Sequence, residues 1–142
     1  MDTSFLSHLS NNLKQLFTFL QDYGYMLSKS EMISDEEFKL TYINEEKGKE
    51  IYISLCNSSN TQRFFIYIAI IRIPHLVVHD FVSFNVFMDK NTIKRPELLE
   101  GTQRNIENAN KYIKDYADLF KKYGIELIIS DKQFPHYFPE WT

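Results

Sequence analysis

The sequence holds one cysteine and four glycines among its 142 residues, and its formal net charge is only −3. The single cysteine, Cys56, excludes an internal disulfide and is typical of a reducing compartment, so we expect a cytoplasmic protein. Binding to a nucleic-acid backbone needs clustered positive charge, and the small negative charge argues against such a partner. The composition therefore favours one globular domain, residues 1–142, that does not bind nucleic acid.

The small number of glycines also argues against several kinds of active site. The glycines are isolated from one another, at Gly24, Gly48, Gly101 and Gly124. The sequence accordingly has no glycine-rich phosphate loop and no Gly-x-Ser-x-Gly turn for a nucleophile. No motif predicts catalytic residues or a cofactor, so the sequence favours a binding protein over an enzyme. Acids and histidines at distant positions leave open an active site that only the fold assembles.

One histidine pair has a spacing that suits a metal on a helix. His75 and His79 lie four residues apart, which would place both imidazoles on one helical face. Pro74 and the apolar residues between the histidines instead predict an extended segment, in which four residues span roughly 13 Å. Two imidazoles at that separation cannot bind one zinc ion, so no metal site is expected.

The longest apolar run, residues 63–73, is too short to span a bilayer, and the first residues lack the positive charge of a signal peptide. No membrane partner is therefore expected. The β-branched and aromatic residues of the run predict a strand. Because alternate positions on both of its sides are apolar, we expect this strand in the middle of a sheet that is covered on both faces.

The rest of the first two thirds predicts one helix followed by strands. Leucine and phenylalanine recur every three or four residues over residues 3–23, which indicates an amphipathic helix. Weak alternation over residues 25–33 predicts an edge strand, and clearer alternation predicts strands at residues 38–42, 51–55 and 82–88. The short connections indicate an antiparallel meander of four to five strands.

The last third predicts a helix and an apolar end. Residues 96–123 have helical periodicity, with Pro96 suited to the first turn and Gly124 at the end. The segment before Asn105 is less regular and is either the start of this helix or a separate short turn. Residues 125–129 are apolar and short, either a last strand or a buried connector. The predicted class is α+β: an N-terminal amphipathic helix, a central antiparallel meander sheet, a long C-terminal helix and a short apolar C-terminal segment.

Two acidic turns are candidates for partner binding. Asp35, Glu36 and Glu37 form the first, and Glu45 and Glu46 belong to the second. Each suits either a solvated turn or a contact with a basic partner. A strand of about seven residues, roughly 20 Å long, separates the turns, so they are not expected to form one patch.

The aromatic tail, residues 134–142, is a further candidate. Its two prolines exclude a helix or a central strand. Tyr137 and Trp141 either cover the core or form an exposed apolar patch that marks an interface.

The layout resembles the small acidic immunity proteins of bacterial polymorphic-toxin and contact-dependent-inhibition systems. The resemblance rests on the leading helix, the antiparallel sheet and the Tyr-Ala-rich segment 108–124, which runs into the apolar residues 125–129. Where such families end in a glycine-containing segment, this chain has Ser130 and Asp131. The resemblance implies a non-catalytic protein that binds a cognate toxin, such as a basic toxin domain, and often blocks its active site.

Two other classes remain open. Export chaperones also include small acidic α+β domains with an N-terminal amphipathic helix, and they are usually dimers. A small-molecule-binding protein or enzyme would use a cavity between sheet and helix, with polar groups converging on it.

Overall fold

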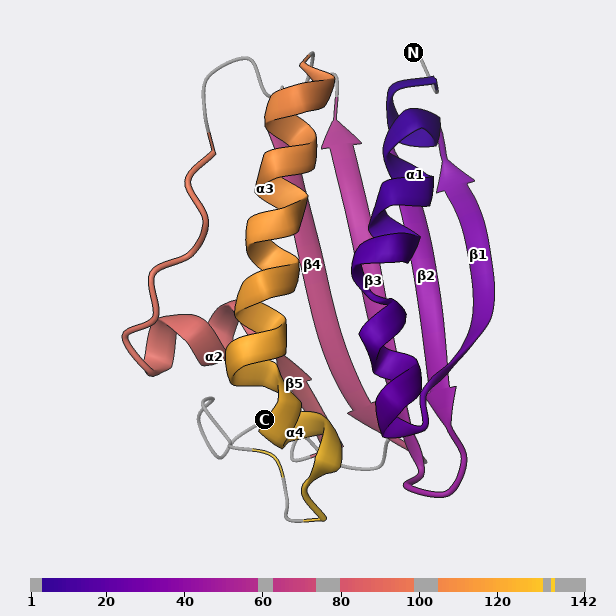
Figure 1. Cartoon of the computed structure of the whole chain (residues 1–142), viewed down its shortest axis with the longest axis vertical. Helices are drawn as coiled ribbons and strands as arrows, with labels where there is room; N and C mark the ends of the chain where they lie inside the picture. The colour runs from indigo at the N-terminus through magenta and orange to yellow at the C-terminus, as the bar shows by residue number, and fades with distance from the viewer. Residues whose placement is uncertain (1–3, 59–62, 74–79, 99–104, 132–133, 135–142) are drawn as a thin grey trace, which may run out of the picture.

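The computed structural model describes residues 4–58, 63–73, 80–98, 105–131 and 134 (Figure 1). It confirms the α+β class, with a helix at the N-terminal end, a five-stranded antiparallel sheet and helices in the last third. The elements are α1 (Ser4–Leu16), η1 (Thr18–Tyr23), β1 (Met26–Ser34), β2 (Glu37–Asn44), β3 (Lys49–Ser58), β4 (Arg63–Arg72), β5 (Phe81–Ser83), α2 (Phe84–Lys90), α3 (Ile106–Leu119), η4 (Phe120–Gly124) and α4 (Ile125–Ile129).

The sheet is a meander, as predicted. Its strand order is β1-β2-β3-β4-β5, and every neighbouring pair is antiparallel. The first strand follows Gly24, whose positive φ of 86° ends η1 in a left-handed turn. A two-residue turn joins β1 to β2, and residues 45–48 join β2 to β3. These short connections make each strand pair with its sequence neighbour.

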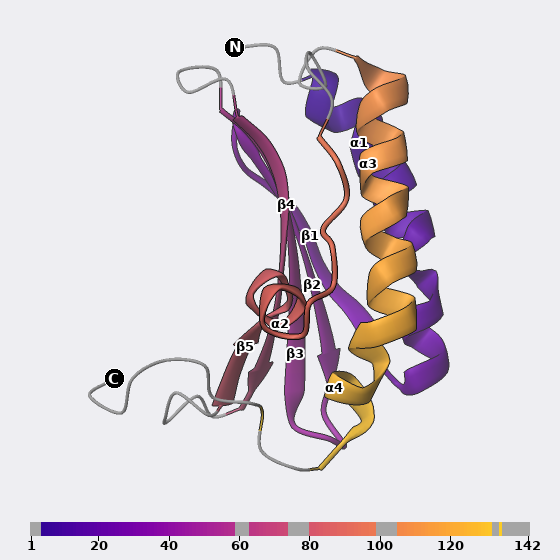
Figure 2. The ribbon, with the colours of Figure 1, turned by 90° about the vertical axis from the view of Figure 1, so that its left-hand side faces the viewer.

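Both long helices lie on the same side of the sheet (Figure 2). The side chain of Asn12 on α1 donates a 2.8 Å hydrogen bond to Oδ1 of Asn110 on α3, so the two helices contact each other directly. Alternate strand residues face these helices and are buried, among them Leu40, Ile53 and Ile66. Apolar residues of α1 complete the core, at Leu6, Leu9, Leu13 and Phe17.

The prediction that β4 is covered on both faces is wrong. The residues of β4 that face the helices are fully buried, whereas Phe65, Tyr67 and Ile71 on the other face are only half-buried. The reason is the placement of the helices, which come from the two ends of the chain and pack side by side on one face. At its other edge β4 pairs with only the three residues of β5.

The predicted strand over residues 82–88 is also wrong beyond Ser83. The chain turns there into the helix α2, whose first turn is capped by the Ser83 hydroxyl accepting from the backbone N–H of Val86. Phe84 and Met88 are both buried. Residues four apart share a face in a strand as well as in a helix, so this apolar spacing fits both structures.

The C-terminal helix begins after Asn105, the later of the two starts that the sequence allows, and it ends later than predicted. Its N-cap is Asn105, whose side chain accepts a 3.1 Å hydrogen bond from the N–H of Asn108, so Pro96 is not in its first turn. Gly124 does not end it, because a π-helical turn leads into α4 and residues 125–129 are helical. At Gly124 a Cβ atom would lie 2.5 Å from the ring of Phe120, so this glycine allows a close approach.

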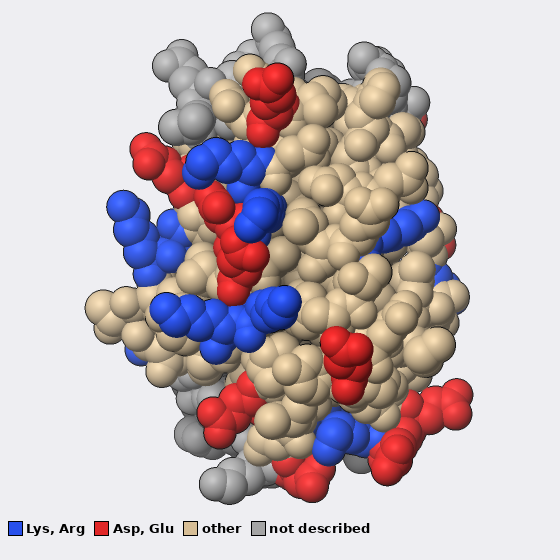
Figure 3. Space-filling model, viewed as in Figure 1, with Lys and Arg blue, Asp and Glu red and all other residues tan. Residues whose placement is uncertain are grey.

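Charged side chains gather on one part of the helix-covered side of the molecule. Figure 3 shows them along α3 and at the lower end, whereas the surface over α1 carries few. On α3 the exposed charges pair along the helix, as in the 3.0 Å contact of Lys111 with Asp115 and the 2.8 Å contact of Lys114 with Asp118. Such exposed pairs contribute little stability, about 0.3–0.5 kcal/mol each.

Candidate functional site

The sheet face that points away from α1 and α3 carries aromatic and charged side chains together, and we call it the outer sheet face. On β2, β3 and β4 its residues lie between buried residues that face the helices, and Thr41, Ser54 and Ala69 of the outer face are themselves buried. Lys29 and Glu31 join it from β1, where they pair with Thr41 and Lys39 of β2. The central strands contribute Lys39, Thr41 and Ile43, then Glu50, Tyr52, Ser54 and Cys56, then Phe65, Tyr67, Ala69 and Ile71. The described helices leave this face open (Figure 2).

A hollow of about 300 Å³ opens on the outer sheet face across β1, β2 and β3. At its lining, Nζ of Lys39 lies 4.2 Å from the centre of the Tyr52 ring, a cation–π contact. The Tyr52 hydroxyl donates a hydrogen bond to Oε2 of Glu50. Burial and this carboxylate raise the pKa of Tyr52 to about 12, so the phenol stays protonated at neutral pH. The three side chains form an ordered polar group that suits recognition of a partner.

Cys56 lies at the far end of the same face, beside Glu37. Burial, and secondly the negative charge of Glu37, raise the pKa of the Cys56 thiol to about 11. A nucleophilic cysteine needs the opposite environment, because the thiolate is the reactive form. The arrangement therefore keeps Cys56 as a thiol.

At the other end of β3, the side chain of Lys49 is buried against the end of α4. Its Nζ donates to the carbonyl oxygens of Leu127, at 3.1 Å, and of Ser130. Burial, with repulsion from Arg72 and Lys47, lowers the pKa of Lys49 to about 8. A buried lysine with a lowered pKa is a recurrent sign of catalysis. Here the amine is bonded to main-chain oxygens, so a structural role accounts for it.

Two further cations complete this contact. Nζ of Lys47 donates a 3.0 Å hydrogen bond to the carbonyl of Ile129 and lies 3.7 Å from the Asp131 carboxylate. Nη2 of Arg72 donates to the carbonyl of Asp131 at 3.3 Å, and its guanidinium lies over the ring of Phe134. Helices leave their last carbonyls unbonded and carry partial negative charge at that end. The cations therefore cap α4 and attach it to the sheet.

The two predicted acidic turns lie at opposite ends of β2, as the sequence indicated. Asp35 and Glu36 occupy the turn between β1 and β2, and Glu37 begins β2 on the outer sheet face. Glu45 and Glu46 lie in the turn between β2 and β3. Tyr137 and Trp141, the other residues predicted to contact a partner, lie outside the described residues, as does the pair His75 and His79.

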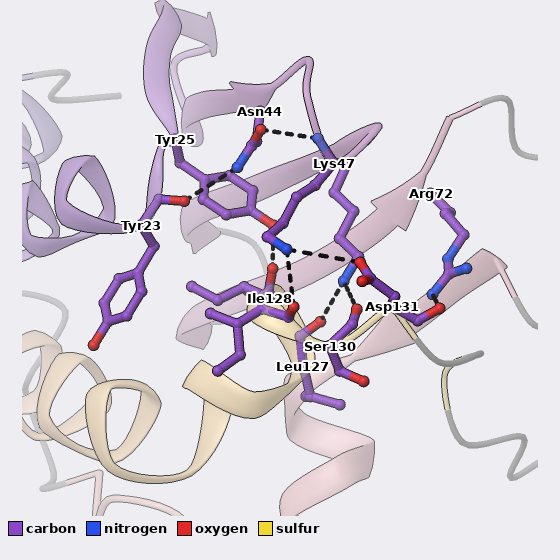
Figure 4. Close-up of polar contacts among 11 residues, drawn as sticks. Tyr23, Tyr25, Asn44, Lys47, Arg72, Leu127, Ile128, Ser130 and Asp131 are labelled. Carbon is purple, nitrogen blue, oxygen red and sulfur yellow. Dashed lines mark hydrogen bonds and ion pairs between the residues drawn. The ribbon is translucent and has the colours of Figure 1, made fainter.

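A second hollow, of about 360 Å³, opens beside the turn that holds Glu45 and Glu46. Both glutamates line it, together with Asn44. The Asn44 side chain donates to the carbonyl of Tyr23 at 3.1 Å and accepts from the N–H of Lys47 at 3.0 Å, so it fixes the shape of the turn (Figure 4). The hollow is therefore an acidic surface on a rigid loop, and it does not lie between sheet and helix.

Sequence reasoning missed the outer sheet face because it assigned the half-exposed aromatic residues of β4 to a buried layer. A signal was present in the neighbouring strands. The polar residues Lys39 and Thr41 alternate with apolar residues on β2, and Tyr52 and Ser54 do so on β3, although Thr41 and Ser54 are themselves buried. A sheet whose central strands alternate in this way has one polar face, which a second helical layer would not cover.

No protein-family model matches this chain, and no curated protein or solved structure is significantly similar to it. Among the residues that the structure describes, no helix is long and apolar enough to cross a membrane. Within the same residues, no three His, Cys, Asp or Glu side chains are grouped so as to hold a metal ion. The fold and the geometry of the outer sheet face therefore carry the functional argument.

Proposed function

We propose that this chain is a cytoplasmic protein-binding module that acts as an immunity protein, neutralising a cognate toxin by direct contact. The observation that carries the proposal is the outer sheet face, where Tyr52, Phe65 and Tyr67 lie among charged side chains. Aromatic anchors within a polar surround are characteristic of protein interfaces. Because strands hold these anchors, binding requires little reorganisation, which favours high affinity.

The charge of the surface favours a basic partner. Carboxylates stand at both ends of β2, and the whole chain has a net charge of −3. Opposite charges accelerate the encounter of two proteins and disfavour partners of the wrong sign. A positively charged toxin domain is a partner that fits this pattern. The bound chain would block the active site of that domain.

Co-expression with the toxin encoded beside this gene in the native host tests the proposal. We expect the wild-type chain to restore growth and the purified pair to bind with a nanomolar Kd. Replacing Tyr52 by Ala removes the ring under Lys39, and we expect at least a tenfold weaker complex because hot-spot aromatic residues contribute about 2 kcal/mol or more. Lys111→Ala on the outer side of α3 is the matched control and should bind as the wild type does.

Charge reversal at Asp35, Glu36 and Glu37 locates the partner along the face. Weaker binding and a lower association rate are expected if the first acidic turn guides the encounter. Unchanged binding would assign the contact to the opposite end of β2. A toxin that is neither bound nor neutralised by the wild-type chain would overturn the proposal.

A further inference from the structure

The first strand of the sheet has an accessible edge. Among the described residues β1 pairs only with β2, and all nine of its residues are exposed. They include four large apolar side chains close together on one strand, Met26 at 63% exposure and Ile33 at 48%, with Leu27 and Met32 at 39%. The opposite edge, β5, is only three residues long. An exposed edge with apolar side chains favours pairing with another strand.

Two irregularities limit how much of β1 can pair. The register with β2 shifts between Leu27 and Lys29, and again between Met32 and Ser34. Such bulges twist an edge strand and prevent long, open-ended pairing. Between them lies a short regular stretch, from Lys29 to Met32. The geometry therefore permits a small, closed contact.

The regular stretch is complementary to itself. Lys29 and Glu31 lie on the outer sheet face, one on each side of Ser30. If two copies pair antiparallel about an axis through Ser30, each Lys29 lies opposite Glu31 of the second copy, which makes two cross-strand ion pairs. Moving the axis to residue 29 or 31 would instead place like charges opposite each other. Beyond the bulges, exposed Leu27 of one copy then approaches exposed Ile33 of the other.

We propose that this chain forms a two-fold symmetric dimer through antiparallel pairing of β1 with β1 of a second copy. The contact joins two five-stranded sheets into one, with the helices of both copies on the same side. A second copy is the expected partner because, in antiparallel pairing, the order lysine, serine, glutamate places each lysine opposite a glutamate of the other copy. The dimer is independent of the proposed toxin binding, and it makes the two outer sheet faces continuous.

Sedimentation analysis tests the dimer at concentrations from about 1 to about 300 µM, the range in which small interfaces associate. We expect the wild-type mass to rise from that of one chain, 17.0 kDa, towards that of two. Lys29→Glu and Glu31→Lys place like charges opposite each other, so each variant should remain a single chain at concentrations where the wild type is dimeric. Lys90→Glu, which makes the same charge change on α2 beyond the other sheet edge, should dimerise normally.

Mixing the two charge variants gives the decisive measurement. Lys29→Glu has two acids at the contact and Glu31→Lys has two lysines, so an equimolar mixture should form mixed dimers although neither variant dimerises alone. The double variant Lys29→Glu/Glu31→Lys should also recover the dimer, and circular dichroism should show that all variants are folded. A wild-type mass of 17.0 kDa at every concentration, or a mixture that stays monomeric, would overturn the proposal.

Discussion

The hydroxyl of Tyr25 donates a 2.7 Å hydrogen bond to the carbonyl oxygen of Ile128, 103 residues further along the chain. Tyr25 is fully buried, just before β1, and Ile128 lies near the end of α4. Burial raises the pKa of Tyr25, so its phenol stays protonated and donates. This single contact connects the start of the sheet to the end of the last helix.

Tyr25→Phe should lower the free energy of unfolding by about 1–2 kcal/mol, because a buried carbonyl loses its hydrogen-bond donor while the ring packing is kept. Urea unfolding followed by fluorescence measures the change. Tyr23→Phe is the control, since that side chain is 37% exposed, and it should alter stability by less than about 0.5 kcal/mol. Equal stability of the wild type and Tyr25→Phe would contradict the expected contribution of this bond.

Gly124→Ala should destabilise the protein although alanine has the higher helix propensity. The new Cβ would lie 2.5 Å from Phe120, whose buried ring packs edge-on against Phe84 at 4.9 Å. Propensity favours alanine by about 1 kcal/mol, whereas forcing a buried ring to move costs about 1–3 kcal/mol. Thermal unfolding should show a lower Tm for Gly124→Ala than for the wild type. Phe120→Leu in the same background should recover part of the loss, and a raised Tm for Gly124→Ala alone would show that the ring moves freely.

Cys56 should react slowly with thiol reagents in the folded protein. A pKa raised from 9.0 to about 11 lowers the thiolate fraction at pH 8 by about a hundredfold. Because a more basic thiolate is also a stronger nucleophile, alkylation should be slower than in urea by about tenfold or more. Glu37→Gln removes the neighbouring charge and should accelerate the reaction of the folded protein. Glu45→Gln, at the other end of β2, should not. If the folded wild type, Glu37→Gln and Glu45→Gln react at the same rate, limited access to the thiol, and not the charge of Glu37, controls its reactivity.

Lys49 should make stability depend on alkaline pH. Its folded pKa is about 8, below its ordinary value of 10.5, so between these values the unfolded chain binds more protons than the folded one. The contribution of Lys49 to stability therefore increases as the pH rises through this window. Because Cys56 and the tyrosines titrate in both proteins, the measurement is the difference between the wild type and Lys49→Met.

Lys49→Met should be less stable at every pH, by about 1–3 kcal/mol, because two carbonyls at the end of α4 lose their donor. This difference should widen between pH 7.5 and pH 10. Parallel stability curves for the two proteins would show that the ammonium group is not destabilised by its surroundings.

Much of the sheet could be predicted because its strands have a clear period of two. Phe38, Leu40 and Tyr42 are buried on β2 as their alternation indicates. Whether helices cover one face of the sheet or both could not be predicted in the same way. Phe65 and Tyr67 are apolar residues whether a helix or a binding partner covers them, so their composition does not distinguish the two cases.

The predicted end of the C-terminal helix was wrong for a related reason. Glycine is common at helix ends, but it also occurs where a ring approaches the backbone closely, and only the position of Phe120 shows that Gly124 is the second kind. The acidic turns could be placed from the sequence. The group formed by Lys39, Tyr52 and Glu50 could not, because it depends on strand register, in which Thr41 is the residue directly opposite Tyr52.

The pairing of the first helix with the third has a consequence during protein synthesis. The buried leucines of α1 share one core with α3, which begins about 90 residues after α1 ends. At a translation rate of about 5–20 residues per second, a ribosome needs roughly 5–18 s to make the intervening chain. For that time the side of α1 that contacts α3 stays uncovered, and a premature stop before residue 106 makes that state permanent. Holding factors at the ribosomal exit and quality-control proteases would therefore recognise a truncated chain by this uncovered side of α1.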